Sequence, residues 1–131
     1  IGQIMKILRV LAFELPVMKN MAVLKICNEM KIEFKLIKKE NMHKTLGFLA
    51  GAVGIPEINP EYDISDLNSE FGELLVFAGF NTQEIEAFLD KYKKCNVPKV
   101  KYKAMLTEYN ALWSLAFLYK ELKKEEENLC L

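Results

Sequence analysis

The chain has 131 residues, and its eighteen basic and eighteen acidic side chains give a formal net charge of zero. This balance argues against the positive field with which proteins attract nucleic acid or acidic lipid. No apolar run reaches the roughly 18 to 20 residues of a membrane-spanning helix, and we expect no membrane partner. Three cysteines, an odd number, argue against a disulfide framework and predict a reducing, cytoplasmic location.

The first half opens with a strand and a helix. Ile7 to Leu15 is almost continuously apolar, which suits a strand inside a sheet. Pro16 ends this run and favours a helix start, because its fixed φ suits the first turn and its missing N–H would be unpaired there anyway. We therefore predict a helix over Val17 to Met30. Three of its apolar residues recur at helical spacing: Val17, Met21 and Leu24.

A second strand and a second helix complete this half. Ile32 to Leu36 alternates apolar and polar residues, the pattern of a strand with one face on the core. A shorter helical segment is expected from about Asn41 to Val53. Within it, Gly47 and Gly51 have the four-residue spacing that favours close packing of a helix against its neighbour.

The second half repeats the order of the first. Leu74 to Ala78 is an apolar strand. Asn81, followed three residues later by Glu84, predicts a capping box at the start of a helix, since each side chain can bond to the backbone N–H of the other. Val100 to Ala104 alternates like its counterpart in the first half. Thr107 is then placed to cap a last helix.

An offset of 68 positions aligns the two halves. The matched pairs include Cys27 with Cys95, Lys35 with Lys103, and Glu40 with Glu108. Because the matched residues sit on predicted elements of the same type, we interpret 5–55 and 74–124 as a duplicated unit within one domain, 1–131. Residues 56–73 join the halves with six acidic residues and no basic one, and we expect a surface connection.

These patterns predict an α/β fold around a four-stranded sheet with the first and third strands in the centre. Lysines on the outer strands would discourage edge-to-edge pairing. The alternating strands indicate one face in solvent and favour the α+β type, a two-layer, ferredoxin-like sandwich. Strict alternation of strands and helices favours the alternative, a three-layer parallel four-stranded sheet.

The sequence contains no strong catalytic motif: no P-loop, dinucleotide fingerprint, Cys-x-x-Cys or His-Glu-x-x-His. His43 is the only histidine and is expected on the surface. Cys27 and Cys95 fall late in helices, away from the helix N-terminus that would lower a thiol pKa. We predict no catalytic residue, no metal and no cofactor.

Polar residues gather around the end of the last predicted strand. The segment reads Lys103-Ala104-Met105-Leu106-Thr107-Glu108-Tyr109-Asn110-Ala111-Leu112-Trp113. It resembles a bacterial family of domains of unknown function whose C-terminal signature reads Lys-Ala-x-Leu-Thr-Glu-x-Asn-x-x-Trp, and the resemblance implies no assigned activity. The candidate binding residues are Lys103, Thr107, Glu108, Asn110 and Trp113, with Glu40 expected nearby.

We favour a non-catalytic binding or regulatory module over an enzyme. The alternative is a small-ligand or divalent-cation-binding enzyme that uses Glu40 and Glu108, which the apparent duplication places at equivalent strand ends. An RNA-binding module is least favoured, because Tyr102 alternates away from the face of Lys101 and Lys103 and leaves no stacking platform. The assembly we expect is a homodimer through helix faces, since lysine-rich edges disfavour sheet continuation.

Overall fold

The computed structural model describes residues 7–62 and 71–129. These residues form, in chain order, β1 (Arg9–Phe13), α1 (Val17–Met30), β2 (Glu33–Ile37), the 3-10 helix η1 (Lys39–Asn41), α2 (Leu46–Leu49), the 3-10 helix η2 (Pro60–Tyr62), β3 (Leu74–Ala78), α3 (Thr82–Lys94), β4 (Tyr102–Met105) and α4 (Leu115–Leu129). Within these ranges no helix has the length and apolar character needed to cross a bilayer.

The four strands form one mixed sheet in the order β2-β1-β3-β4. β1 is parallel to β2 and β3 is parallel to β4, whereas the central strands β1 and β3 are antiparallel, with Arg9 opposite Ala78 and Phe13 opposite Leu74. The prediction that the first and third strands are central is confirmed. The mixed orientation differs both from the ferredoxin-like arrangement and from the fully parallel alternative.

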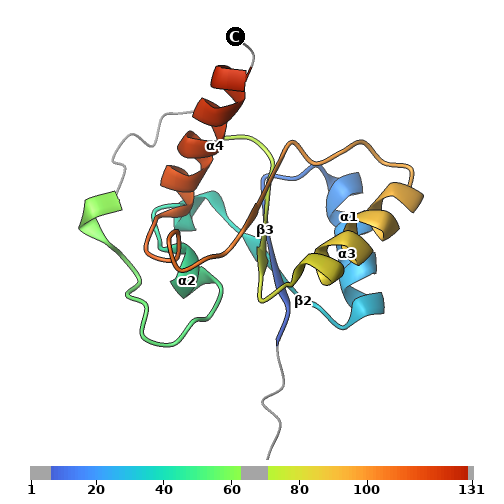
Figure 1. Ribbon diagram of the computed structural model, residues 1–131, viewed down its shortest axis with the longest axis horizontal. Coiled ribbons are helices and arrows are strands. Elements are labelled where there is room, and N and C mark those ends of the chain that lie inside the picture. Colours follow the sequence, from blue (N-terminus) through green and yellow to red (C-terminus); the bar gives the residue numbers. More distant parts are fainter. Residues whose placement is uncertain (1–6, 63–70, 130–131) are drawn as a thin grey trace, which may run out of the picture.

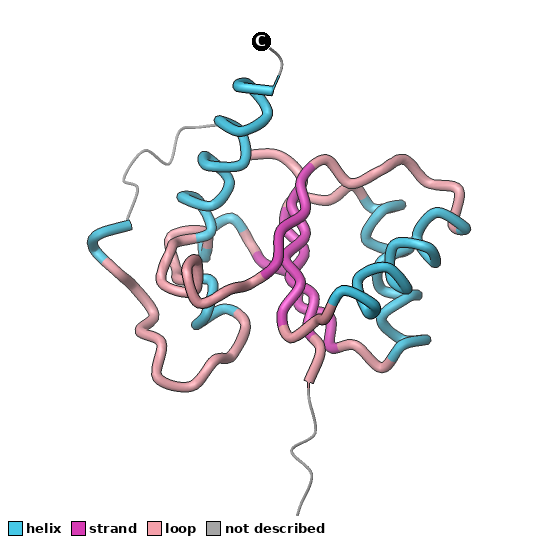
Figure 2. The backbone as a smooth tube through the Cα atoms, in the orientation of Figure 1, coloured by secondary structure: helices cyan, strands magenta, loops and turns pink. Residues whose placement is uncertain are grey.

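Helices cover both faces of the sheet, which makes three layers. α1 and α3 lie on one face, and α2 and α4 lie on the other (Figure 1, Figure 2). The predicted two-layer sandwich is therefore wrong. The alternation in β2 and β4 reflects their edge positions, where helices leave part of each strand exposed.

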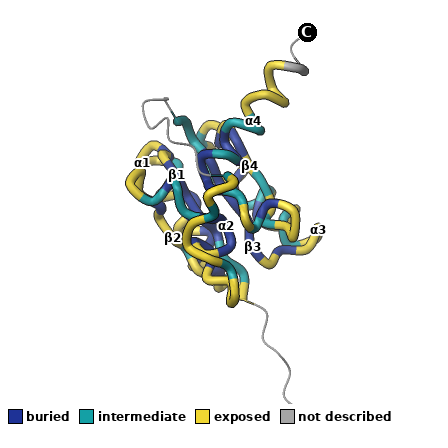
Figure 3. The backbone as a smooth tube through the Cα atoms, turned by 90° about the vertical axis from the view of Figure 1, so that its left-hand side faces the viewer, coloured by how far each residue is buried: buried dark blue, intermediate teal, exposed yellow. Residues whose placement is uncertain are grey.

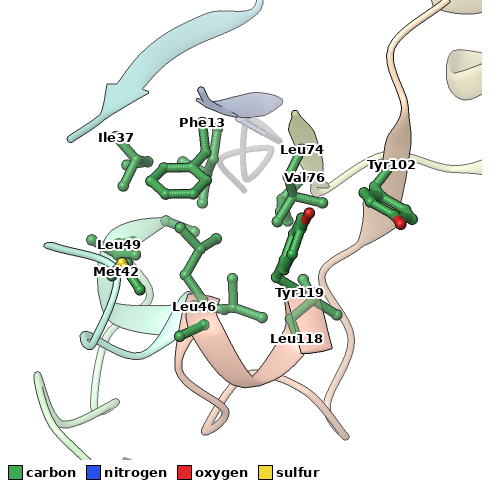
Figure 4. Packing of buried hydrophobic residues seen from close by; sticks show 14 of the residues in the cluster. Phe13, Ile37, Met42, Leu46, Leu49, Leu74, Val76, Tyr102, Leu118 and Tyr119 are labelled. Atoms are coloured by element: carbon green, nitrogen blue, oxygen red, sulfur yellow. The ribbon is translucent and has the colours of Figure 1, made fainter. Parts of the chain in front are cut away.

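The central strands hold two hydrophobic clusters, one on each face. Every residue of β3 is buried, because both of its faces are covered. On the α2–α4 face, Phe13, Leu74 and Val76 point toward Leu46 and Tyr119 (Figure 4). The cluster on the other face contains three aromatic residues in edge contact, with ring centroids 5.1 to 6.3 Å apart: Phe77, Phe80 and Phe88. Burial on both sides of the sheet supplies most of the hydrophobic stabilisation.

Two predicted features of the long helices are confirmed. α1 spans Val17–Met30 as predicted and follows Pro16 directly. At the start of α3, the Asn81 side chain accepts from the Glu84 N–H and the Glu84 carboxylate accepts from the Asn81 N–H, both at 2.8 Å. This capping box satisfies backbone donors that the first helical turn leaves unpaired.

The outward face of α1 differs from the expected amphipathic pattern. The three apolar residues at helical spacing, Val17, Met21 and Leu24, are exposed. The face on the core is formed instead by a different set: Ala22, Val23, Ile26 and Cys27. α1 therefore has apolar residues on opposite sides, and their spacing alone did not identify the buried side.

Two predicted helices are corrected by the structure, the short one from Asn41 and the last one from Thr107. The helix expected from Asn41 to Val53 is reduced to the single turn of α2, whose N-cap is Thr45. The last helix does not begin at Thr107. Residues 108–112 form turns, and α4 begins only at Leu115, after Ser114 accepts the Phe117 N–H at 3.0 Å. α4 is buried at its start and exposed toward its C-terminal end (Figure 3).

The two halves meet beneath the sheet through paired backbone bonds. The Leu46 N–H donates to Trp113 O at 2.9 Å and the Leu115 N–H donates to Lys44 O at 3.2 Å, around an antiparallel bridge between Thr45 and Ser114. The residues in corresponding roles, 46 with 115 and 44 with 113, are 69 positions apart. This arrangement relates the halves by a local approximate twofold symmetry.

The structural correspondence differs from the predicted offset of 68. The first residues of β1 and β3, 9 and 74, and of α1 and α3, 17 and 82, are 65 positions apart. β2 and β4 begin 69 positions apart, at 33 and 102, so Lys35 and Lys103, paired by the offset of 68, leave the sheet on opposite faces. The Lys35 Nζ donates to Leu49 O beside α2 at 2.6 Å, whereas Lys103 lies beside α3. An origin by duplication stays a prediction.

Part of the acidic connection is described. Glu57 pairs with Lys44 at 2.8 Å, and Glu73 pairs with Lys19 at 2.6 Å. Three of its six acidic residues lie outside the described residues: Asp63, Asp66 and Glu70. The two paired carboxylates serve local structure, since each lies against a lysine of the folded body.

Candidate functional site

Asn110 organises the turn after β4. Its Oδ1 accepts the Thr107 N–H at 2.8 Å, its own N–H donates to the Thr107 Oγ1 at 3.2 Å, and its Nδ2 donates to Met105 O at 2.9 Å. Asn110 is buried, so these bonds replace water that its amide would otherwise bind. Thr107 and Asn110 therefore form a closed structural loop, with their polar groups directed at each other.

The other candidates near this loop do not join them in one concavity. Glu108 and Glu40 are both exposed. Trp113 is half-buried, packs against Phe117 with ring centroids 4.9 Å apart, and lies on the α2–α4 face. The structure brings Thr107 and Asn110 together, whereas Glu108 and Glu40 do not line the cavity that holds Lys103.

Lys103 lies on the opposite face of the sheet from its strand neighbours. Tyr102 and Ala104 pack into the α2–α4 cluster, and Tyr102 is buried. Lys103 alternates to the other side and faces α3, where its Nζ donates to Val100 O at 3.4 Å. Tyr102 is buried, and the Lys101 Nζ lies 5.4 Å from the centre of its ring, so Tyr102 does not turn away from Lys101 as predicted.

The Lys103 side chain borders a cavity between α3 and β4, which we call the α3–β4 pocket. Its volume is about 200 Å³. The walls are apolar and the rim is basic, as its lining shows: Leu75, Phe88, Leu89, Tyr92, Lys93, Lys99, Val100 and Lys103. A second hollow of about 210 Å³ lies on the other side of Lys103 and shares Leu89 with the first. Lys103 thus stands between two hollows along the edge of the sheet.

Lys103 is exposed overall, but partial burial of its side chain lowers its pKa, and the nearby positive charge of Lys99 lowers it further. Among the described residues, no carboxylate lines the pocket to compensate these charges. Tyr92 does not offer its hydroxyl to the cavity, because the hydroxyl donates to Pro98 O at 2.6 Å. Burial raises the pKa of Tyr92, with a smaller contribution from Glu73. The polar character of the pocket therefore comes from ammonium groups.

Sequence reasoning identified Lys103 but missed the pocket around it. The lysines of the outer strands are predicted to discourage edge-to-edge pairing, and Lys103 is also predicted as a binding residue. One signal in the sequence could have indicated this pocket. Lysines are dense on both sides of the connection between α3 and β4, and residues 91–107 include no acidic residue. Such a one-signed stretch next to buried apolar residues indicates a local basic site even in a neutral chain.

The described residues offer no second site of a recognisable chemical kind. They contain no group of three or more His, Cys, Asp and Glu residues that could hold a metal ion. Cys27 is a free, buried cysteine, and burial raises the pKa of its thiol to about 12. Cys95 is half-buried, and its Sγ donates to Lys91 O at 3.4 Å. Burial of the Cys27 thiol therefore disfavours the thiolate that a cysteine nucleophile requires.

The pocket lies in the part of the chain that matches a known family model. Residues 73–129, from the residue before β3 through α4, match the domain of unknown function DUF3783. Comparison with curated proteins gives no match, and comparison with solved structures gives none either. The second half of the chain is therefore similar to a family of domains of unknown function.

Proposed function

We propose that the protein is a non-catalytic binding module that holds a small organic anion in the α3–β4 pocket. The ligand has a carboxylate or phosphate head and a compact apolar body. The observation that carries this proposal is a pocket whose lining, in the part of the chain that the structure describes, combines apolar walls with three rim lysines and includes no carboxylate. The earlier alternative, an enzyme built on Glu40 and Glu108, gains no support from two exposed side chains outside this pocket.

The shape of the pocket limits the size of the ligand. Sites for drug-sized molecules have volumes of roughly 300 to 1,000 Å³, whereas this cavity measures about 200 Å³. The apolar lining includes three buried residues, Leu75, Phe88 and Val100. A short alkyl or single-ring body would remove these side chains from water, and its burial would contribute about 25 cal/mol per Å².

The charge of the pocket selects the head group. Lys103 and Lys99 repel each other, and burial removes part of the water around Lys103. An anion placed between them would relieve both costs, because it pairs with the two ammonium groups at once. Repulsion that destabilises the empty pocket and is removed by the ligand is typical of binding sites, where part of the local stability is lost in favour of recognition.

The proposal includes a cytoplasmic location and a regulatory role. Cys27 and Cys95 are free thiols in the folded chain, which suits a reducing compartment. The pocket lacks a nucleophile paired with a general base, since its polar side chains are lysines and the bonded Tyr92. Binding without turnover is the use we propose for such a site.

Isothermal titration calorimetry with four probes tests this function: hexanoate, hexyl phosphate, hexan-1-ol and acetate. We expect hexanoate and hexyl phosphate to bind, and the alcohol and acetate to bind at least tenfold more weakly, because each lacks one of the two recognised parts. Lys103→Met should weaken hexanoate binding about tenfold, the size of one charge-assisted contact.

Lys101→Met is the matched control, because it removes the same charge two residues away, immediately before β4. The Lys101 Nζ lies 5.4 Å from the centre of the Tyr102 ring, and Lys101 does not line the pocket. Equal loss of binding in the two variants would contradict the proposed site and indicate general attraction by positive charge. No heat with either anion would contradict the ligand class.

A further inference from the structure

The second hollow beside Lys103 continues the α3–β4 pocket along the edge of the sheet, and we call it the distal hollow. The linings of the two hollows share Leu89 and Lys103. The α3–β4 pocket reaches Val100, which lies before the first residue of β4, whereas the distal hollow reaches Met105, the last residue of that strand. The two hollows therefore follow one another along β4, between this strand and α3.

The lining of the distal hollow is apolar. Phe77 is buried at 2% exposure, and Ile85 and Leu89 pack against the same cluster. Met105 is 42% exposed and leaves the hollow partly open to solvent. Lys103 is the only charged residue that the described part of the chain places in this lining. The distal hollow therefore suits an apolar group and offers an anion no second ammonium group.

The charges of the two hollows differ, and this difference gives a ligand one direction. Lys93 and Lys99 line the α3–β4 pocket and not the distal hollow. A carboxylate in the α3–β4 pocket lies near three lysines, whereas in the distal hollow it would lose water against apolar side chains and find only Lys103. An anion with a long apolar tail is therefore oriented with its head in the α3–β4 pocket and its tail toward Met105.

We propose that the site binds a medium-chain alkyl carboxylate whose tail passes beneath Lys103 and fills the distal hollow. This inference rests on the proposed function, because it takes the anionic head group from the α3–β4 pocket. It adds a subsite for the tail. The two hollows have volumes of about 200 and about 210 Å³, so together they reach the range of roughly 300 to 1,000 Å³ found for drug-sized ligands.

Lys103 is suited to cover such a chain. A lysine has a flexible stem of methylene groups, which lies along apolar surface while the ammonium group stays in water. Among the described residues, the Lys103 Nζ makes one hydrogen bond, a long one of 3.4 Å to Val100 O, and no ion pair. The side chain can therefore shift to admit an alkyl chain without breaking a strong contact.

Isothermal titration calorimetry of the full chain with hexanoate, octanoate and decanoate tests this inference. A fully buried methylene group strengthens binding about fourfold. Because Met105 leaves the distal hollow partly in solvent, we expect smaller steps, and binding of decanoate at least tenfold tighter than binding of hexanoate. ω-Hydroxydecanoate should lose this gain, because the apolar side chains of the distal hollow cannot replace the water around its hydroxyl.

Ile85→Trp tests the position of the tail. The larger ring fills the distal hollow, so decanoate should bind no more tightly than hexanoate, and hexanoate binding should be unchanged. Gln83→Trp is the matched control, because it adds the same ring at an exposed position of α3 outside both linings. This control should keep the tenfold preference for decanoate.

Hexanoate binding without a gain for decanoate would overturn the inference and leave the proposed function standing. An equal gain in Ile85→Trp and Gln83→Trp, or equal affinities for decanoate and ω-hydroxydecanoate, would overturn the assignment of the tail to the distal hollow. Absence of heat with every chain length would overturn the inference together with the proposed function. The hydroxylated probe uses the unaltered chain, so a poorly folded Ile85→Trp variant does not remove the test.

Discussion

Replacement of Asn110 by alanine should destabilise the protein without changing ligand binding. The variant removes one hydrogen bond to the Thr107 N–H and one to Met105 O. Each neutral bond contributes about 1 kcal/mol net, and the partners left without a bond raise the cost, so we expect a loss of about 1–3 kcal/mol. For a chain of this length that loss lowers the melting temperature by about 4–12 °C.

Two further variants sharpen the test. Asn110→Asp retains an acceptor for the Thr107 N–H but turns a carboxylate oxygen toward Met105 O. It should be at least as unstable as Asn110→Ala at pH 7 and should recover partly below about pH 4, where the protonated carboxyl can donate. Glu108→Ala changes an exposed residue and should stay within about 0.5 kcal/mol of the unaltered chain.

Thermal and urea unfolding measure these free energies, and hexanoate calorimetry measures binding in the same variants. Asn110→Ala with unchanged stability would refute the structural role assigned to the loop. Asn110→Ala with unchanged stability and lost hexanoate binding would show that the loop belongs to the site.

Three other predictions concern reactivity and packing. Because its pKa is lowered by burial and by a neighbouring positive charge, Lys103 should be acylated at a lower pH than Lys101, which competitive labelling with mass spectrometry measures; equal pH profiles would contradict this environment. Gly47→Val should lower the free energy of unfolding by about 1–3 kcal/mol, because a Cβ at residue 47 would lie 2.9 Å from side-chain atoms of Ile55. A variant that unfolds at the same urea concentration as the unaltered chain would contradict this close packing. Cys27, whose thiol pKa is raised to about 12, should resist iodoacetamide at pH 8 until the chain unfolds, and rapid labelling of the native protein would contradict its burial.

The sequence predicted best where local signals and burial agree. β3 and α1 have their predicted bounds, and the Asn81 capping box occurs as expected, because these depend on neighbouring residues. The predicted number of layers was wrong for a different reason. An alternating strand has the same sequence pattern whether its polar residues lie on the open face of a two-layer sheet or at the edge of a three-layer one. Only the order of the strands in the sheet distinguishes these two cases.

The last helix shows how a correct local interaction led to a wrong element. Thr107 does accept a backbone N–H three residues later, as an N-cap would. The side chain of Asn110 then bonds back to Thr107 and closes a turn, so the helix starts only after Ser114. Local capping patterns cannot separate a helix start from a closed turn, because both satisfy the same backbone donors.

The candidate site was found only in part. Lys103 belonged to the predicted set because of its position in a signature segment, whereas the pocket depends on Leu75 and Phe88, which are distant in sequence. Apolar residues that line a cavity have the same sequence pattern as residues of a filled core. The predicted offset of 68 also treated Lys35 and Lys103 as equivalent residues, although they lie on opposite faces of the sheet.

The most direct test of the account is nuclear magnetic resonance of the methyl-labelled chain with hexanoate. We predict that the methyl signals of Leu75, Leu89 and Val100 show intermolecular contacts with the hexanoate chain, and that these contacts disappear in Lys103→Met but persist in Lys101→Met. Contacts at the α1 methionines with none at these three residues would contradict the assignment of the α3–β4 pocket as the binding site.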